Sequence, residues 1–211
     1  MIPSGEPPTS PPVVNHRDIE LRLASSADAP DLCEIYRPYV EETPISFEAI
    51  APSCEEMASR VDSVLPRFPW LVAKVGERIV GYAYAHEFAA RAAYRWSIES
   101  SIYIRDDFQR RGIGTALYSA LLGIAAAQGY QECFAGIALP NDSSIRMHEA
   151  IGFSRVATFQ RVGWKRNSWH DVGWWQRSLG DRDDAPPEPI GLDLLGHDLL
   201  GRFLAGYEGR S

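Results

Sequence analysis

The sequence predicts an α/β (α+β) fold in which helices flank a central mixed β-sheet. Apolar residues alternate in short runs typical of strands and recur at helical spacing in longer runs, in the order β-α-α-β-β-β-α-β-α-β-β. One strand leads through a turn of arginine and glycine directly into a helix. The hydrophobic fraction of 45% in 211 residues is enough for one stable core.

Strands and capped helices fill the first half of the chain. Asp28 is placed to cap a helix over 29–39, because a side-chain oxygen can accept from the first free N–H groups. Ser53 is placed to cap a second helix that ends near residue 65, with Glu56 three positions later as in a capping box. The strands expected here are 19–23, 70–75 and 79–87, the last two joined by a tight turn at 76–78.

The second half begins with the strand 96–104, which feeds the glycine turn. The helix that follows the turn ends near Gly129. Pro140 and the polar residues after it form a turn into a further helix. The remaining elements expected are a helix at 144–151 and strands at 133–138, 153–162 and 172–179.

The fold is expected to occupy residues 18–180, between two tails. Residues 1–17 are rich in proline and serine and lack periodicity, which predicts a disordered N-terminal tail. Residues 181–189 hold three prolines and four acidic residues and form a linker. The rest of 181–211 has leucines at helical spacing interrupted by glycines, which predicts a weakly amphipathic C-terminal tail.

Composition excludes several classes of function. The net charge of −7 does not suit general nucleic-acid binding, which needs a basic face. Three widely spaced cysteines form no metal spacing with histidine, so no metal site is expected, and thiols suit the reducing cytoplasm. The sequence shows no signal peptide and no run of ~20 apolar residues, so no membrane span is expected.

The turn before the central helix has the properties of an anion site. Backbone N–H groups at a helix N-terminus lack partners, and the helix dipole favours negative charge there. Glycines let a ligand approach the backbone, and arginines supply donors suited to phosphate. The residues are Gln109, Arg110, Arg111, Gly112, Ile113, Gly114, Thr115 and Ala116.

Two nucleotide-binding motifs match this turn less well. The dinucleotide fingerprint G-x-G-x-x-G is incomplete because Leu117 stands at its last position. A Walker loop is excluded, since no Gly-Lys-Ser/Thr follows. A plain basic turn before a helix remains an alternative. The sequence therefore favours a site for the pyrophosphate of a cosubstrate.

The turn resembles motif A of the GNAT acetyltransferases, Q/R-x-x-G-x-G/A, which holds the pyrophosphate of acetyl-CoA. Several longer sequence motifs resemble those of the phosphinothricin N-acetyltransferase group and occur in the same order as in that group. The group includes relatives that act on methionine sulfoximine and methionine sulfone. The resemblance covers about residues 20–179 and implies the GNAT acyl-CoA N-acyltransferase fold, acetyl-CoA as cosubstrate and a homodimer. The matching runs are 35–36, 42–48, 81–85, 91–96, 139–143, 148–153, 163–165 and 169–176.

Two residues are the catalytic candidates. The resemblance places the general base at Glu99, on the strand before the glycine turn. A carboxylate there can take the proton of an ammonium group, directly or through water, and burial would raise its pKa toward a useful value. His148 stands where many GNAT enzymes have a tyrosine that protonates the departing thiolate. It can act as an acid, bind substrate or coenzyme, or be a buried helix histidine.

Further candidates for binding acetyl-CoA lie outside the turn. The backbone of Ile102, Tyr103 and Ile104 is expected to bind the pantetheine arm, and one N–H would serve as an oxyanion donor. Asn141 resembles the GNAT asparagine that bonds this arm, or it caps the following helix. Ser143 belongs to the same run and is assigned with it to the cosubstrate site.

The acceptor site is assigned to Phe47, Arg91 and Tyr94. A guanidinium can clamp the carboxylate of an amino-acid analogue, and the two aromatic rings can wall its chain. Core packing of Phe47 and a solvated Arg91 are the alternatives. A second group, rich in aromatic residues, is expected to form a far wall or a dimer contact, and consists of Trp164, Lys165, Trp169 and His170.

The function expected from these features is N-acetylation of a small amino-acid analogue: phosphinothricin, methionine sulfoximine or methionine sulfone. The amine would attack acetyl-CoA directly in a ternary complex. The alternatives are acetylation of another amino-acid-like metabolite and a non-catalytic sensor or interaction module that binds acyl-CoA. The presence of Glu99, His148 and Arg91 argues against the sensor.

Overall fold

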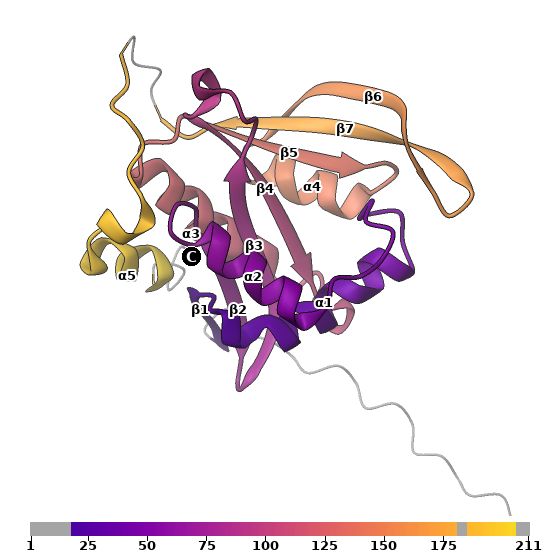
Figure 1. Ribbon diagram of the computed structural model, residues 1–211, viewed down its shortest axis with the longest axis horizontal. Helices are drawn as coiled ribbons and strands as arrows, with labels where there is room; N and C mark the ends of the chain where they lie inside the picture. The colour runs from indigo at the N-terminus through magenta and orange to yellow at the C-terminus, as the bar shows by residue number, and fades with distance from the viewer. Residues whose placement is uncertain (1–17, 181–184, 206–211) are drawn as a thin grey trace, which may run out of the picture.

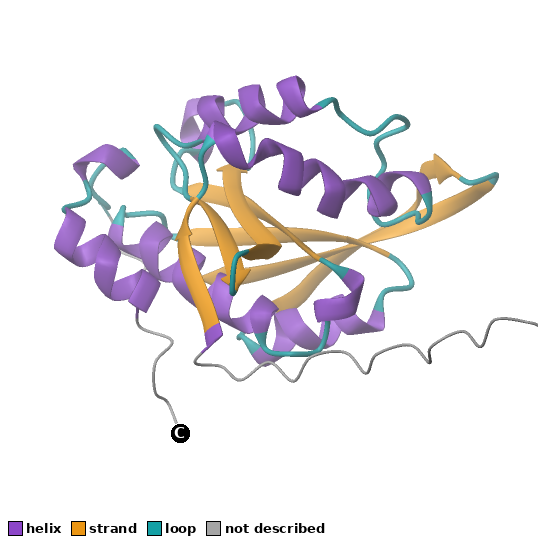
Figure 2. Ribbon diagram, turned by 90° about the horizontal axis from the view of Figure 1, so that it is seen from below, coloured by secondary structure: helices purple, strands orange, loops and turns teal. Residues whose placement is uncertain are grey.

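The computed structural model describes residues 18–180 and 185–205, so the tail predicted over 1–17 lies outside the described residues. A seven-stranded mixed sheet in the order β1-β2-β3-β4-β5-β7-β6 forms the centre, and helices cover both of its faces (Figures 1 and 2). This confirms the predicted fold class. The strands are β1 (Ile19–Leu23), β2 (Trp70–Val75), β3 (Arg78–Glu87), β4 (Ser97–Ile104), β5 (Glu132–Ala138), β6 (Ser154–Lys165) and β7 (Ser168–Ser178). The α-helices are α1 (Ala29–Glu41), α2 (Cys54–Val64), α3 (Ile113–Ala127), α4 (Asp142–Ala150) and α5 (His197–Ala205).

Two hydrophobic cores lie on the two faces of the sheet. One core joins α3 to the sheet and buries Ile98, Leu117 and Leu121 completely. The other joins α1 and α2 to the opposite face, where Leu32 and Val61 are completely buried. Alternate residues of one strand therefore point to different helical layers.

The parallel contact between β4 and β5 is short. It pairs Ser97–Glu99 with Glu132–Phe134, whereas β4 pairs with β3 along its length. Beyond Glu99 the edge of β4 that faces β5 is free of strand partners, while β5 continues beside β7 as far as Ala138. The sheet is therefore split next to residues 100–104, the segment expected to bind the pantetheine arm.

Local structure differs from the sequence prediction at two caps. Asp28 precedes α1, but its side chain makes no cap bond to that helix; it accepts from the N–H of Ser25 at 2.8 Å and holds Arg22 through two bonds of 2.7 Å. Ser53 caps α2 as predicted, by accepting from the N–H of Glu56 at 3.1 Å. The Glu56 carboxylate pairs with Arg60 within the helix. Both carboxylates thus bind a guanidinium, and hydrogen bonds between ionised partners are stronger than those from a neutral amide.

Strands β6 and β7 are longer than the sequence suggested. They form one hairpin that turns at Arg166 and Asn167, both with positive φ. Residues 163–171, which carried no strand prediction, are mostly paired in it, and the hairpin projects past the rest of the sheet (Figure 1). Aromatic residues face solvent along it, so the pattern of a buried strand is missing.

The C-terminal segment packs on the domain. Leu192 and Leu195 join the core beneath α3, and α5 lies beside α3 (Figure 1). A Cβ added at Gly123 of α3 would collide with the ring of Phe203, so a glycine there allows the two helices to approach closely. Within residues 185–205, the tail predicted to be amphipathic therefore includes the helix α5, which packs against the first core.

Candidate active site

The glycine turn closes with two residues in the left-handed region. Arg110 has φ 60° and Gly112 has φ 79°, and α3 begins at Ile113. The first backbone bond of the helix runs from the N–H of Ala116 to the carbonyl of Gly112 at 3.0 Å. The N–H groups before it have no partner within the helix, which gives the turn the donors that an anion needs.

Gly114 and Gln109 connect this turn to its surroundings. A Cβ at position 114 would lie 2.5 Å from the sulfur of Met147, so glycine lets the Met147 side chain pack directly on the start of α3. Gln109 donates from Nε2 to the hydroxyl of Tyr39 at 3.2 Å. The Arg111 guanidinium lies over the ring of Phe108, and Thr115 begins the helix beside Gly114.

The free edge of β4 is bridged by a side chain from α1. The hydroxyl of Tyr39 donates to the carbonyl of Ile104 at 2.6 Å and accepts from its N–H at 3.3 Å. The backbone groups of Ile104 therefore face away from β3, and those of Ile102 face the same way. Tyr103 pairs with Tyr82 of β3, and its ring lies against the second core.

Glu99 lies at the point where β4 and β5 separate. Its Oε1 lies beside Gly136 of β5, next to the indole of Trp174. Burial raises the pKa of its carboxyl above the ordinary value, while the nearby His86 acts in the opposite direction. Within residues 18–180 and 185–205 no hydrogen bond contributes to this pKa. A half-buried carboxylate with free lone pairs suits a general base.

His148 lies inside the protein rather than on a surface. Its side chain is 2% exposed, and Nδ1 lies 2.7 Å from the carbonyl of Ser144. A carbonyl can only accept, so Nδ1 carries the proton and Nε2 accepts from the Tyr118 hydroxyl at 2.9 Å. The Tyr118 oxygen in turn lies 3.2 Å from Ser100 of β4. Burial lowers the pKa of His148, so the ring is neutral at pH 7.

Asn141 acts as a helix cap in this structure. Its Oδ1 accepts from the N–H of Ser144 at 3.2 Å and from the hydroxyl of Ser143 at 3.1 Å. Capping was one of the two roles open to Asn141. Ser143 is exposed and lies at the start of α4, close to the turn that carries Asn141.

The three predicted acceptor residues lie on two different loops. Arg91 and Tyr94 are exposed on the connection between β3 and β4, where Tyr94 packs edge-on against Phe88 at 5.8 Å. Phe88 stacks on Phe134 of β5 at 4.3 Å and continues to Trp174 beside Glu99. This row of rings connects Tyr94 to the carboxylate.

Phe47 comes from the loop between α1 and α2, and its ring is 42% exposed. It occupies the space that a side chain at Gly163 of β6 would need and lies 6.3 Å from the ring of His170. Lys165 fixes this loop to the hairpin, because its ammonium donates to the carbonyls of Val40 and Ser46. The exposed rings of Trp164 and Trp169 pack on each other at 5.3 Å further along the hairpin.

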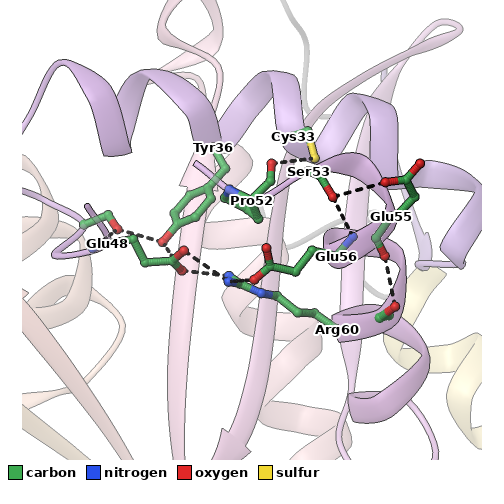
Figure 3. A network of polar contacts seen from close by, with 10 residues as sticks. Cys33, Tyr36, Glu48, Pro52, Ser53, Glu55, Glu56 and Arg60 are labelled. Carbon is green, nitrogen blue, oxygen red and sulfur yellow. Dashed lines mark hydrogen bonds and ion pairs between the residues drawn. The ribbon is translucent and has the colours of Figure 1, made fainter. Parts of the chain in front are cut away.

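A pocket of ≈ 220 Å³ opens on the same face of the sheet as Glu99. One wall is aromatic, since Trp70 stacks on Tyr84 at 4.2 Å. The opposite wall includes Arg60, whose guanidinium is held by Glu48 and Glu56 (Figure 3). The lining residues are Tyr36, Met57, Arg60, Ser63, Val64, Trp70, Tyr82, Tyr84 and His86.

Sequence reasoning missed His86, Ser100 and Tyr118. His86 is directly opposite Glu99 in the pairing of β3 with β4. The connection from 88 to 96 is too long to fix a register, so this neighbour could not be read from the sequence. Tyr118 and Ser100 lie in none of the matching runs, and only the contacts from His148 to Tyr118 and from Tyr118 to Ser100 distinguish them.

The chain matches the family model for the acetyltransferase (GNAT) domain over residues 21–174. It belongs to the GNAT acetyltransferase family. It is 40% identical to a phosphinothricin N-acetyltransferase of Streptomyces viridochromogenes, over 82% of this chain and 94% of that protein. It is 31% identical to an L-methionine sulfoximine/L-methionine sulfone acetyltransferase of Pseudomonas aeruginosa, over 79% of this chain and 98% of that protein.

A GNAT phosphinothricin acetyltransferase from Sinorhizobium meliloti, solved in complex with acetyl-CoA, has the same fold. The TM-score is 0.78 and the identity 36%, with 82% of this chain and 95% of that chain covered. The protein is thus an N-acetyltransferase that uses acetyl-CoA. Across the described ranges, no helix is long and apolar enough to span a membrane, and no group of three or more His, Cys, Asp or Glu side chains could hold a metal.

Proposed function

We propose that this GNAT enzyme acetylates the α-amine of a small amino-acid analogue such as phosphinothricin, methionine sulfoximine or methionine sulfone. The observation that carries the proposal is the position of Glu99, half-buried at the split between β4 and β5 and without a hydrogen bond in the described chain. The relatives in Streptomyces and Pseudomonas carry the names of these substrates and match most of the chain.

The glycine turn and the open edge of β4 fit acetyl-CoA. The free N–H groups of residues 112–115 and the charge of Arg110 and Arg111 suit its pyrophosphate. The backbone of Ile102, at the split in the sheet, can bind the pantetheine arm and place an N–H on the acetyl oxygen. The bonds between Tyr39 and Ile104 lie at the same edge. Asn141 and Ser143 lie in the turn that starts α4 and complete the proposed site.

Glu99 supplies the acid–base chemistry. An amino acid carries an ammonium group at pH 7, so Glu99 removes one proton before the nitrogen can attack. The nitrogen lone pair then forms the C–N bond to the carbonyl carbon, and in a later step the C–S bond breaks, the sulfur leaves with the electron pair, and the second proton of the nitrogen passes to the thiolate to give CoA. A tetrahedral oxyanion forms between these steps, and the N–H of β4 stabilises it. The transfer is direct, in a ternary complex.

The acceptor is bound by the loops around Glu99. Arg91 lies exposed on the connection before β4, where its guanidinium can clamp a carboxylate in bidentate fashion. Tyr94 and Phe47 provide aromatic surfaces on either side. His148 is a buried neutral ring in this scheme, and its link to Ser100 through Tyr118 supports β4 behind the reacting groups.

The exposed rings of the β6–β7 hairpin support a homodimer. Trp164 is 57% exposed and Trp169 48% exposed, with the apolar side chains of Val156, Phe159 and Val162 exposed along β6. A second copy that covers this face would remove these rings from water. The free thiols of Cys33 and Cys133 are buried, as suits work in the cytoplasm.

Steady-state kinetics with a panel of amines tests the proposal. CoA release would be measured with phosphinothricin, methionine sulfoximine, methionine sulfone, the common amino acids and a lysine peptide. We expect one of the first three to give the highest kcat/KM. A higher value on the peptide would contradict the substrate class, and tight acetyl-CoA binding without turnover would favour the sensor.

A further inference from the structure

His86 of β3 is a titratable residue that lies directly beside Glu99 of the neighbouring strand β4. The two residues are paired directly in the antiparallel register of β3 and β4, so their side chains leave the same face. His86 is half-buried and lines the pocket, whereas Glu99 lies at the split between β4 and β5. The pair therefore connects the proposed catalytic carboxylate with the neighbouring pocket of ≈ 220 Å³.

The tautomer of His86 is fixed by its own strand. Nδ1 lies 3.0 Å from the carbonyl of Glu87, and a carbonyl accepts hydrogen bonds but cannot donate them. Nδ1 therefore carries the proton of the neutral ring, and Nε2 keeps its lone pair. A histidine held in this way has one nitrogen ready to accept a proton while the other anchors the ring.

The charges around the pocket leave this ring available. Arg60 is the cation on the opposite wall, and the carboxylates of Glu48 and Glu56 compensate it (Figure 3). Tyr84 lies beside His86 with ring centres 5.9 Å apart. The other titratable and charged groups that line the pocket are Tyr36 of α1, Arg60 of α2, and Tyr82 and Tyr84 of β3, while Glu99 of β4 is paired with His86 beside it.

We propose that His86 accepts the substrate proton from Glu99 and passes it to solvent through the pocket. This proposal rests on the proposed function. Acetyl transfer to an ammonium releases one proton per turnover, so a base that has taken it must lose it before the next cycle. An N–H bond of the substrate breaks as an O–H bond forms on Glu99. The O–H bond then breaks as the proton passes through one water to His86 Nε2, where an N–H bond forms, and the imidazolium gives this proton to solvent.

Attraction between the two product charges offsets part of the desolvation cost of the second transfer. A neutral carboxyl beside a neutral imidazole becomes a carboxylate beside an imidazolium, and the opposite charges attract. The positive charge of His86 lowers the pKa of Glu99 and so opposes the effect of burial. His86 acts through Glu99 and does not need to touch the substrate.

The test combines chemical rescue with a titration that needs no turnover. In His86→Asn we expect kcat to fall by about 10²-fold, the lower end of the loss expected for an acid–base group, and imidazole in the buffer to restore it. Acetyl-CoA affinity should not change. His197→Asn, in an exposed histidine at the start of α5, is the matched control and should keep the wild-type rate with and without imidazole.

The carboxyl resonance of Glu99 is then titrated by NMR in the wild type and in His86→Asn. We expect the variant to show the higher Glu99 pKa, because the compensating charge is gone. A variant with the wild-type kcat, or a loss that imidazole does not reverse, overturns the relay. An unchanged pKa of Glu99 in the variant would show that the charge of His86 does not act on Glu99, and would also overturn the proposal. Absence of turnover in the wild-type enzyme, on every amine, would instead remove the proposed function.

Discussion

The Tyr118 hydroxyl donates to His148 Nε2 over 2.9 Å and links α3 to α4 beneath the free edge of β4. Both side chains are almost completely buried, and the second nitrogen of the histidine is bound to the Ser144 carbonyl. A neutral imidazole with its only N–H engaged cannot donate a proton without rearrangement. In the free enzyme His148 therefore holds α3 and α4 together and does not act as a proton donor.

Tyr118→Phe should destabilise the protein, because it leaves the buried Nε2 of His148 without a donor. An unsatisfied buried acceptor costs about 1–3 kcal/mol. The free energy of unfolding in urea measures this loss. The double variant with His148→Leu removes both polar partners and should lose less than the sum of the single variants. Additive losses would contradict the coupling.

The same histidine predicts a pH dependence of stability. Burial lowers the pKa of folded His148 below the ordinary value of 6.5. The unfolded chain then takes up a proton that the folded chain lacks as the pH falls below 6.5. The stability is complete above that pH and decreases below it. Urea unfolding at pH 7.5 and 5.5 measures the loss, which should be smaller in His148→Asn. Equal pH dependence in both proteins would refute the assignment.

Glu99→Gln should lower kcat/KM for the amine by about 10²–10⁴, because an amide cannot take the proton of the ammonium group. The affinity for acetyl-CoA should be unchanged, since that site lies at the turn and on the backbone of β4. The exposed Glu87 at the end of β3 offers a matched control, and Glu87→Gln should keep wild-type activity. Undiminished turnover in Glu99→Gln would remove this residue from the mechanism.

Gly114→Ala should lower both the melting temperature and the affinity for acetyl-CoA. The new Cβ would lie 2.5 Å from the Met147 sulfur, so either the Met147 side chain must leave its place or α3 must shift away from α4. Overpacking of this kind costs about 1–3 kcal/mol. Calorimetry of unfolding and of acetyl-CoA binding measures both effects.

Two further variants control the glycine experiment. Gly114→Ala with Met147→Ala makes room for the methyl group and should recover much of the loss. Gly201→Ala in α5 meets no atom within 4 Å and should leave binding unchanged. Failure of the double variant to recover would show that the backbone of the turn, and not the sulfur contact, requires glycine at position 114.

Trp164→Glu should shift the enzyme toward monomers if a second copy covers the β6–β7 hairpin. A charge in an apolar interface is costly to bury. Sedimentation velocity over a range of concentrations measures the effect. Leu194→Glu introduces the same charge at another exposed apolar position, 68% exposed and outside the hairpin, and should leave assembly unchanged. A wild-type protein that stays monomeric at every concentration would exclude the homodimer.

Much of the fold could be predicted because it depends on local patterns. The periodicities at 19–23 and 70–75 predict β1 and β2, and the glycine turn predicts where α3 begins. The cap at Asp28 was wrong because Arg22, six residues earlier, competes for the carboxylate. The length of the β6–β7 hairpin was missed because its side chains do not alternate between core and solvent.

The sequence by itself determined the elements, the anion-binding turn and the family, since each depends on residues that are neighbours in the chain. Only the tertiary structure decided which side chains from distant parts of the chain come into contact. It placed His86 opposite Glu99, closed the free edge of β4 with Tyr39, and buried His148 against Tyr118. Those contacts depend on strand register and helix packing, which sum over many weak interactions along the whole chain.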